Sequence, residues 1–122
     1  MLLNDFFRID DLVREDQSAK ASLTLNPGHP VFGGHFPGQP VVPGACLLQM
    51  VQDMAAVITG REWLLIKADH CKFIAKIDPR INTTLEMTVR YKETGDGQLD
   101  ISADLSREGA VCFKFRGVFR SV

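Results

Sequence analysis

Apolar and polar residues alternate along much of the C-terminal half of the chain. The alternation has a period of two over residues 85–91, 99–105 and 111–119. This period puts apolar side chains on one face of a strand and polar side chains on the other. Glycine-containing turns separate the three runs, at 95–97 and 108–109. The pattern predicts an antiparallel meander with one buried face.

A different periodicity governs the middle of the chain. Eleven of the sixteen residues from Gly44 to Thr59 are apolar, and they occur all round a helical wheel. A helix of this kind must be covered on most sides. Its remaining polar side chains are spaced three and four residues apart and share one face, which would meet solvent, a partner subunit or a substrate. They are Gln49, Gln52 and Asp53. We therefore predict a central helix from about Pro43 to Thr59, ended by Gly60.

The remaining segments complete an α+β architecture. Residues 21–25 alternate as a strand, 63–77 reads as a long strand with a bulge, and Phe6 to Arg14 fits a helix or a strand equally well. The stretch from Pro27 to Gly44 holds five of the six prolines and five of the ten glycines, which predicts an ordered, apolar loop. One helix among several strands predicts a sheet that curls around that helix.

Composition narrows the class of protein. The 122 residues are 45% hydrophobic and 24% charged with a net charge of −1, which predicts a single domain over 1–122 and makes nucleic acid an unlikely partner. The longest mostly apolar stretch, Pro40 to Ile58, is interrupted by Gln49, Gln52 and Asp53, and the N-terminus lacks the pattern of a secretion signal. We therefore expect a soluble, cytoplasmic protein. The three cysteines are expected to be reduced and mostly buried; they are Cys46, Cys71 and Cys112.

The loop before the central helix contains the most specific motif. Residues 34–44 read GHFPGQPVVPG and run directly into the apolar helix. This stretch resembles the signature of the 3-hydroxyacyl-acyl carrier protein dehydratases of the FabA/FabZ type. The resemblance extends at lower specificity over nearly the whole chain. It implies a hotdog fold, with an antiparallel sheet of about five to six strands wrapped around one helix, and it favours a strand at Phe6 to Arg14.

The resemblance implies a role for His35 and for the start of the helix. In this family the loop histidine removes a proton from C2 of a 3-hydroxyacyl thioester, and His35 matches it. A neutral imidazole is suited to that task. The backbone N–H of Gly44, with that of Ala45, would hold the thioester oxygen as it gains enolate character. Glycine at position 44 also allows a substrate to approach the backbone closely.

Other residues around the motif are assigned more general roles. Candidate substrate-binding residues, on the motif's pattern, are Phe36, Gly38, Val41, Pro43 and Ala45. Phe36 would flank an acyl tunnel, although it, Phe32 and Val41 are also read as loop-packing residues. His29 and His70 have no comparable context and are expected to be structural or surface residues. No metal site and no cofactor are predicted, because no recognised ligand spacing occurs.

The helix departs from the family pattern at one position. The family's acidic residue, which handles the departing 3-hydroxyl, falls at Gln49, and an amide cannot serve as a general acid. One turn later the family commonly has glutamine, and this chain has Asp53. Asp53 is either a relocated acid or a solvated or salt-bridged carboxylate at a subunit interface.

Three functions follow from these residues. The first is dehydration of carrier-linked 3-hydroxyacyl thioesters to 2-enoyl thioesters in fatty acid or related synthesis. The second is a non-catalytic acyl-thioester-binding protein, or a heterodimer partner of an active homologue, which Gln49 favours. The third is a hotdog thioesterase with Asp53 as its carboxylate. We expect at least a homodimer without a membrane span. An acidic acyl carrier protein would dock on basic residues near the tunnel mouth, with Lys114, Arg116 and Arg120 as candidates.

Overall fold

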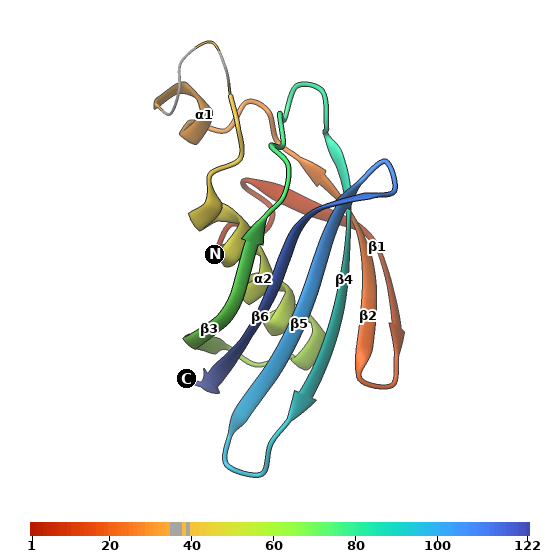
Figure 1. The fold of residues 1–122 in the computed structure, drawn as a ribbon, viewed down its shortest axis with the longest axis vertical. Helices are drawn as coiled ribbons and strands as arrows, with labels where there is room; N and C mark the ends of the chain where they lie inside the picture. Colours follow the sequence, from red (N-terminus) through yellow and green to blue (C-terminus); the bar gives the residue numbers. More distant parts are fainter. Residues whose placement is uncertain (35–37, 39) are drawn as a thin grey trace.

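One antiparallel sheet and a helix packed across it make up the fold (Figure 1). The computed structural model describes residues 1–34, 38 and 40–122. Its elements are β1 (Phe7–Glu15), β2 (Ser18–Leu25), α1 (Val31–Gly34), α2 (Gly44–Thr59), β3 (Trp63–Phe73), β4 (Thr84–Glu93), β5 (Gln98–Arg107) and β6 (Ala110–Ser121). The strand order is β1-β2-β4-β5-β6-β3, so the sheet is not closed into a barrel and β1 and β3 form its edges. The predicted α+β hotdog fold is confirmed.

The core lies between α2 and the curved sheet. Met50 and Met54 of α2 are fully buried, as are the inward-facing Leu23, Leu99 and Phe113 of three different strands. Full burial of such side chains contributes about 1.5–3 kcal/mol each to folding. The helix is therefore held by apolar contact with the sheet. Within the described ranges, neither helix is long and apolar enough to cross a membrane.

The predicted boundaries need small corrections. Helix α2 begins at Gly44, and Pro43 is its extended N-cap residue with φ −63° and ψ 146°. The helix ends at Gly60, whose φ of 74° is left-handed, as the sequence predicts. The proline-rich loop contains a short helix, α1, which the sequence does not predict. Strand β3 ends at Phe73 instead of continuing to Ile77.

Strand β1 explains why its sequence pattern was ambiguous. The register of β1 with β2 shifts between Ile9 and Asp11, which marks a bulge at Asp10. Ile9 and Leu12 pair with the buried residues Leu23 and Ala21, so they point inward although three positions separate them. A bulge inserts one extra residue and breaks the period of two, which gives a strand the spacing of a helix. The strand favoured by the family resemblance is confirmed.

Strand β3 pairs with β6 through two irregularities. The register shifts between Leu65 and Lys67 and again between Ala68 and His70. Gly117 of β6 lies opposite Ala68 in this stretch. A Cβ atom at Gly117 would lie 2.5 Å from the Lys67 carbonyl oxygen and 2.6 Å from Cζ of Phe115. The bulged edge strand therefore depends on glycine at this position.

Gly117→Ala should destabilise the protein, because the added methyl would press against backbone that cannot move without breaking the β3–β6 pairing. Overpacking of this kind costs about 1–3 kcal/mol in the free energy of unfolding. Gly95→Ala is the matched control, since a Cβ at Gly95 meets nothing within 4 Å. Chemical denaturation of both variants measures the difference. Equal stability of the two variants would contradict this description of the β3–β6 pair.

Candidate active site

Residues 35–37 and 39 of the GHFPGQPVVPG stretch lie outside the described residues. His35 and Phe36 both fall there, so their predicted roles stay predictions. Gly38 is described and has a φ of 84°, a left-handed value that favours glycine. Val41 and Pro43 lead from the loop into α2, and Ala45 is exposed in its first turn. The described part of the candidate site therefore consists of α2 and the segments packed against it.

The N-terminus of α2 offers two free backbone donors. The amides of Cys46 and Leu47 donate to the Pro43 carbonyl oxygen over 3.0 and 3.2 Å. The N–H groups of Gly44 and Ala45 have no acceptor in the part of the chain that the structure describes. Unpaired N–H groups at a helix start carry partial positive charge and attract an oxygen that gains negative charge. This geometry suits the predicted oxyanion-binding role of Gly44.

An apolar cavity opens beside these donors. It has a volume of about 380 Å³ and is lined by Val41, Val42, Gly44, Leu47, Phe73, Ile74, Ala75, Lys76 and Ile77. The Phe73 ring stacks on Phe113 with 5.2 Å between the centroids and also covers Gly44. A Cβ on Gly44 would lie 2.9 Å from Cζ of Phe73, so the close approach requires glycine. An acyl chain in this cavity would have its carbonyl group near the free N–H groups.

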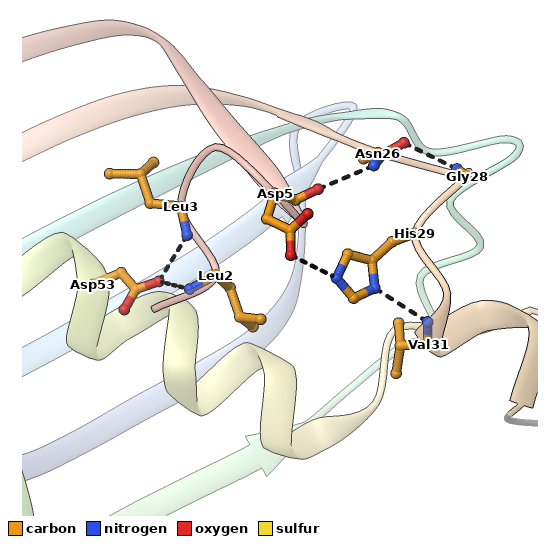
Figure 2. A network of polar contacts seen from close by, with 8 residues as sticks. All are labelled: Leu2, Leu3, Asp5, Asn26, Gly28, His29, Val31 and Asp53. Carbon is orange, nitrogen blue, oxygen red and sulfur yellow. Dashed lines mark hydrogen bonds and ion pairs between the residues drawn. The ribbon is translucent and has the colours of Figure 1, made fainter.

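The polar face of α2 is organised by Asp53. Asp53 is only 2% exposed, although it shares a helix face with the half-buried Gln49 and Gln52. Its Oδ2 accepts hydrogen bonds from the backbone N–H groups of Leu2 and Leu3, over 2.7 and 3.1 Å (Figure 2). Its Oδ1 accepts a hydrogen bond of 2.8 Å from Nε2 of Gln49. The N-terminal segment thus covers Asp53, which is not solvated as one prediction supposed.

Gln52 belongs to the same face but has a different partner. Its Oε1 accepts a hydrogen bond of 3.2 Å from the backbone N–H of Leu65 in β3. A second cavity, of about 220 Å³, lies beside Gln49, Gln52 and Asp53 and reaches Trp63. Gln49 does not line the apolar cavity at Gly44. Within one chain, the two predicted halves of the site therefore open on different cavities.

His29 is a structural residue, one of the two roles predicted for it from the sequence. Its Nε2 lies 3.3 Å from Oδ2 of Asp5, and its Nδ1 accepts a hydrogen bond of 3.1 Å from the backbone N–H of Val31 (Figure 2). The ring packs edge-on against Phe6 with 5.3 Å between the centroids. His29 therefore joins the segment before β1 to the start of α1. His70 is exposed on β3, opposite Arg116.

The three cysteines are free thiols in different environments. Cys112 is buried and donates a hydrogen bond to the Leu105 carbonyl oxygen, Cys46 is half-buried on α2, and Cys71 is exposed on β3. The expectation of mostly buried thiols therefore holds for Cys112, whereas Cys46 is half-buried and Cys71 is exposed. Desolvation by burial raises the pKa of each thiol. A raised pKa lowers the thiolate fraction, so Cys46 is poorly suited to act as a nucleophile.

Basic side chains gather on the outer face of the sheet near the edge strand. Lys114, Arg116 and Arg120 are exposed on β6, and their register partners on β3 include Lys72 and His70. The Lys72–Lys114 pair directly precedes the Phe73–Phe113 pair at the apolar cavity. Of the three residues proposed from the sequence, Lys114 thus lies at the cavity end of β6.

The chain is similar in sequence to known dehydratases. A family model described as ApeI-like, ApeI dehydratase, matches residues 11–114. A 3-hydroxyacyl-[acyl-carrier-protein] dehydratase FabZ from Cereibacter sphaeroides is 30% identical over 116 residues, covering 83% of this chain and 73% of that protein. FabZ of a Ruegeria species is 31% identical over 122 residues, covering 84% and 75%.

A solved structure agrees in fold. One chain of the dehydratase heterocomplex ApeI:P from Xenorhabdus doucetiae superposes with a TM-score of 0.73 at 23% identity. The match covers 92% of this chain and 96% of that one. A hypothetical thioesterase from Streptococcus pneumoniae, solved with coenzyme A, has a TM-score of 0.67 at 8% identity, covering 95% of this chain and 85% of that one. The fold is therefore shared with one protein described as a dehydratase and with another described as a thioesterase.

Proposed function

The chain belongs to the ApeI-like family of FabA/FabZ-type hotdog dehydratases, and we propose that it dehydrates 3-hydroxyacyl thioesters borne on an acyl carrier protein. The observation that carries the proposal is the pair of free N–H groups at Gly44 and Ala45 beside an apolar cavity. These donors lie at the C-terminal end of the GHFPGQPVVPG stretch. Such an arrangement suits an acyl chain whose thioester oxygen becomes negatively charged during reaction.

The proposed reaction is an elimination. His35 takes the proton from C2, the electron pair forms the C2–C3 double bond, and the C3–O bond breaks. The Gly44 N–H stabilises the thioester oxygen while C2 carries negative charge. The departing hydroxyl becomes water with a proton returned by the His35 imidazolium or by solvent. Because Gln49 and Gly44 of one chain open on different cavities, the Gln49 that reaches this hydroxyl would come from a second subunit. It orients the hydroxyl but does not protonate it, so we expect slower turnover than with an acidic residue.

Asp53 is not proposed as the missing acid. Its two oxygens accept three N–H donors, from Leu2, Leu3 and Gln49. These contacts use the acceptor capacity of both oxygens of Asp53. The same contacts weigh against the thioesterase hypothesis, which requires a carboxylate free to activate water.

A heterodimer partner role is the second candidate. This role is favoured because Gln49 occupies the position of the family's acid, while Asp53 is engaged by three donors. The structural relative from Xenorhabdus doucetiae is itself part of a dehydratase heterocomplex. In this case a homologous subunit would contribute the carboxylate, and this chain would contribute His35 and the Gly44 N–H.

The carrier protein is proposed to approach the apolar cavity from its basic rim. Lys76 lines the cavity, and Lys72 and Lys114 lie next to its Phe73 wall. Acyl carrier proteins are acidic, and complementary charge accelerates encounter and sets orientation. Carrier-linked substrate should therefore lose its advantage over pantetheine-linked substrate as ionic strength rises.

Gln49→Glu should raise dehydration by about 10²–10⁴-fold, the usual contribution of a positioned general acid. The introduced carboxyl would face Asp53 across the present 2.8 Å contact. Two facing carboxylates share a proton, which keeps one of them in the form that an acid catalyst needs. The measurement is spectrophotometric hydration and dehydration of 2-enoyl and 3-hydroxyacyl thioesters of several chain lengths.

Two further variants control this experiment. Gln52→Glu places a carboxyl on the same helix face, where the Leu65 N–H holds it, and should bring no comparable gain. His35→Ala should abolish activity in the wild-type and Gln49→Glu backgrounds. A folded Gln49→Glu protein without activity at any chain length would contradict the enzyme proposal and leave the binding or heterodimer role.

A homodimer is proposed to form along β3. This strand is an edge of the sheet, and its apolar side chains Leu64 and Ile66 are 42% and 44% exposed. Long edge strands with apolar side chains tend to pair with another chain. Pairing there would also bring a second chain beside the polar face of α2.

Ile66→Lys should shift the protein from dimer to monomer by at least tenfold in the dissociation constant, since a buried charge at the interface would lack a partner. Lys67→Ala, at the adjacent exposed position, is the control and should leave the dimer intact. Sedimentation velocity across micromolar concentrations measures both. A wild-type protein that sediments only as a monomer contradicts the proposed homodimer.

A further inference from the structure

Asp53 is a buried charged group that the proposed reaction does not use. In the part of the chain that the structure describes, the buried polar or charged residues are Asp53 and Asn82 alone. Burial of a carboxylate is costly unless hydrogen bonds compensate it. The donors to Asp53 come from two places, the backbone of the N-terminal segment and the Gln49 side chain one turn earlier on α2. The contact with Gln49 determines the orientation of the Gln49 amide.

The contact fixes which end of the Gln49 amide faces outward. A carboxylate can only accept, so the NH₂ group of Gln49 must be the end that meets Asp53. The carbonyl Oε1 is then turned away, and no donor to it is found among the described residues. No side-chain oxygen or nitrogen in those residues is both buried and without a partner, so Oε1 is accessible. Gln49 thus presents a hydrogen-bond acceptor.

Gln52 is fixed in the opposite sense. The backbone N–H of Leu65 can only donate, so Oε1 is the end of Gln52 that faces β3. Its NH₂ group is left to face outward. Residues three apart on a helix are neighbours on its surface. The polar face of α2 therefore presents an acceptor from Gln49 beside a donor from Gln52.

We propose that Asp53 is a positioning residue that orients Gln49 so that the α2 face recognises a hydroxyl group. A hydroxyl both donates and accepts, so it can donate to Oε1 of Gln49 and accept from the NH₂ group of Gln52. A ketone only accepts, and its oxygen would face the Gln49 carbonyl oxygen. A methylene group satisfies neither amide. The pair therefore selects 3-hydroxyacyl groups over 3-oxoacyl and saturated ones.

The inference rests on the proposed function only for the identity of the group that bears the hydroxyl. The orientation of the two amides follows from Asp53 and from the Leu65 N–H, whatever acyl chain is bound. The Gln49–Asp53 contact is therefore open to measurement without a ligand. This allows the positioning role and the proposed function to be tested separately.

The decisive variant is Asp53→Asn. The N–H groups of Leu2 and Leu3 would retain the side-chain oxygen of the new amide, because both are donors. Its NH₂ group would then face Gln49, which would turn its own Oε1 inward to accept. Gln49 would now present a donor to the ligand, so the variant should lose the preference for a hydroxyl and favour a ketone.

The matched control is Leu2→Pro. Proline has no N–H, so this change removes the 2.7 Å hydrogen bond to Oδ2 and leaves the Gln49 contact to Oδ1 in place. It loosens the N-terminal segment without turning the Gln49 amide. If Asp53 served only to anchor that segment, both variants would alter ligand binding in the same way.

Calorimetric titration of the full chain with 3-hydroxyoctanoyl, 3-oxooctanoyl and octanoyl pantetheine amides, and with their six- and ten-carbon homologues, tests the selectivity. The wild type should bind the 3-hydroxy ligand about tenfold more tightly than the 3-oxo ligand, a discrimination typical of one hydrogen bond at a half-buried site. Leu2→Pro should keep this ratio, and Asp53→Asn should bring it to one or below. A ratio unchanged in Asp53→Asn, or changed equally in both variants, overturns the proposal.

The second arm uses no ligand. The side-chain NH₂ resonances of Gln49 in a ¹H–¹⁵N spectrum should show a hydrogen-bonded proton in the wild type and in Leu2→Pro, and should lose it in Asp53→Asn. A wild type that binds none of the pantetheine amides while this signature is present counts against the proposed function and supports the positioning of Gln49. Absence of the signature in the wild type overturns the positioning role itself.

Discussion

Apolar packing of α2 against the concave face of the sheet is the contact on which the rest of the molecule depends. The helix residues Met50 and Met54 and the strand residue Phe113 are fully buried between the two elements. With one side of α2 committed to the core, its polar residues can only gather on the opposite side. The same packing sets the helix start at Gly44 against Phe73, which creates the apolar cavity beside the free N–H groups. Site and core are thus two sides of one helix.

Much of the fold follows from local pattern because each element is periodic over its own length. The meander strands and α2 were predicted from alternation and from all-round apolarity, and both are present. Strand β1 could not be predicted in this way, because the bulge at Asp10 inserts one residue and gives the inward-facing positions the spacing of a helix. Helix α1 was not predicted, because a helix of four residues is too short to show a periodic pattern. Its first residue, Val31, donates its backbone N–H to the His29 side chain.

The residues of the candidate site could be predicted from the sequence only where they occupy a position in a recognised motif. Gly44 and Gln49 were found because they occupy fixed positions after GHFPG. The contacts of Asp53 were not, because Leu2 and Leu3 are about fifty positions away and donate through backbone atoms that carry no side-chain signal. The exchange of carboxylate and amide on α2 looked like the loss of an acid. In three dimensions it creates a donor–acceptor pair whose polarity Asp53 sets.

Gln49 and Asp53 act together as one donor–acceptor unit on α2. A double-mutant cycle with Gln49→Glu, Asp53→Gln and the double variant, measured as free energies of unfolding, tests it most directly. Gln49→Glu alone sets two carboxylates against each other across the 2.8 Å contact, and the double variant restores one donor and one acceptor. We predict a favourable coupling of about 1–3 kcal/mol. Additive effects, within about 0.5 kcal/mol, would contradict the claim.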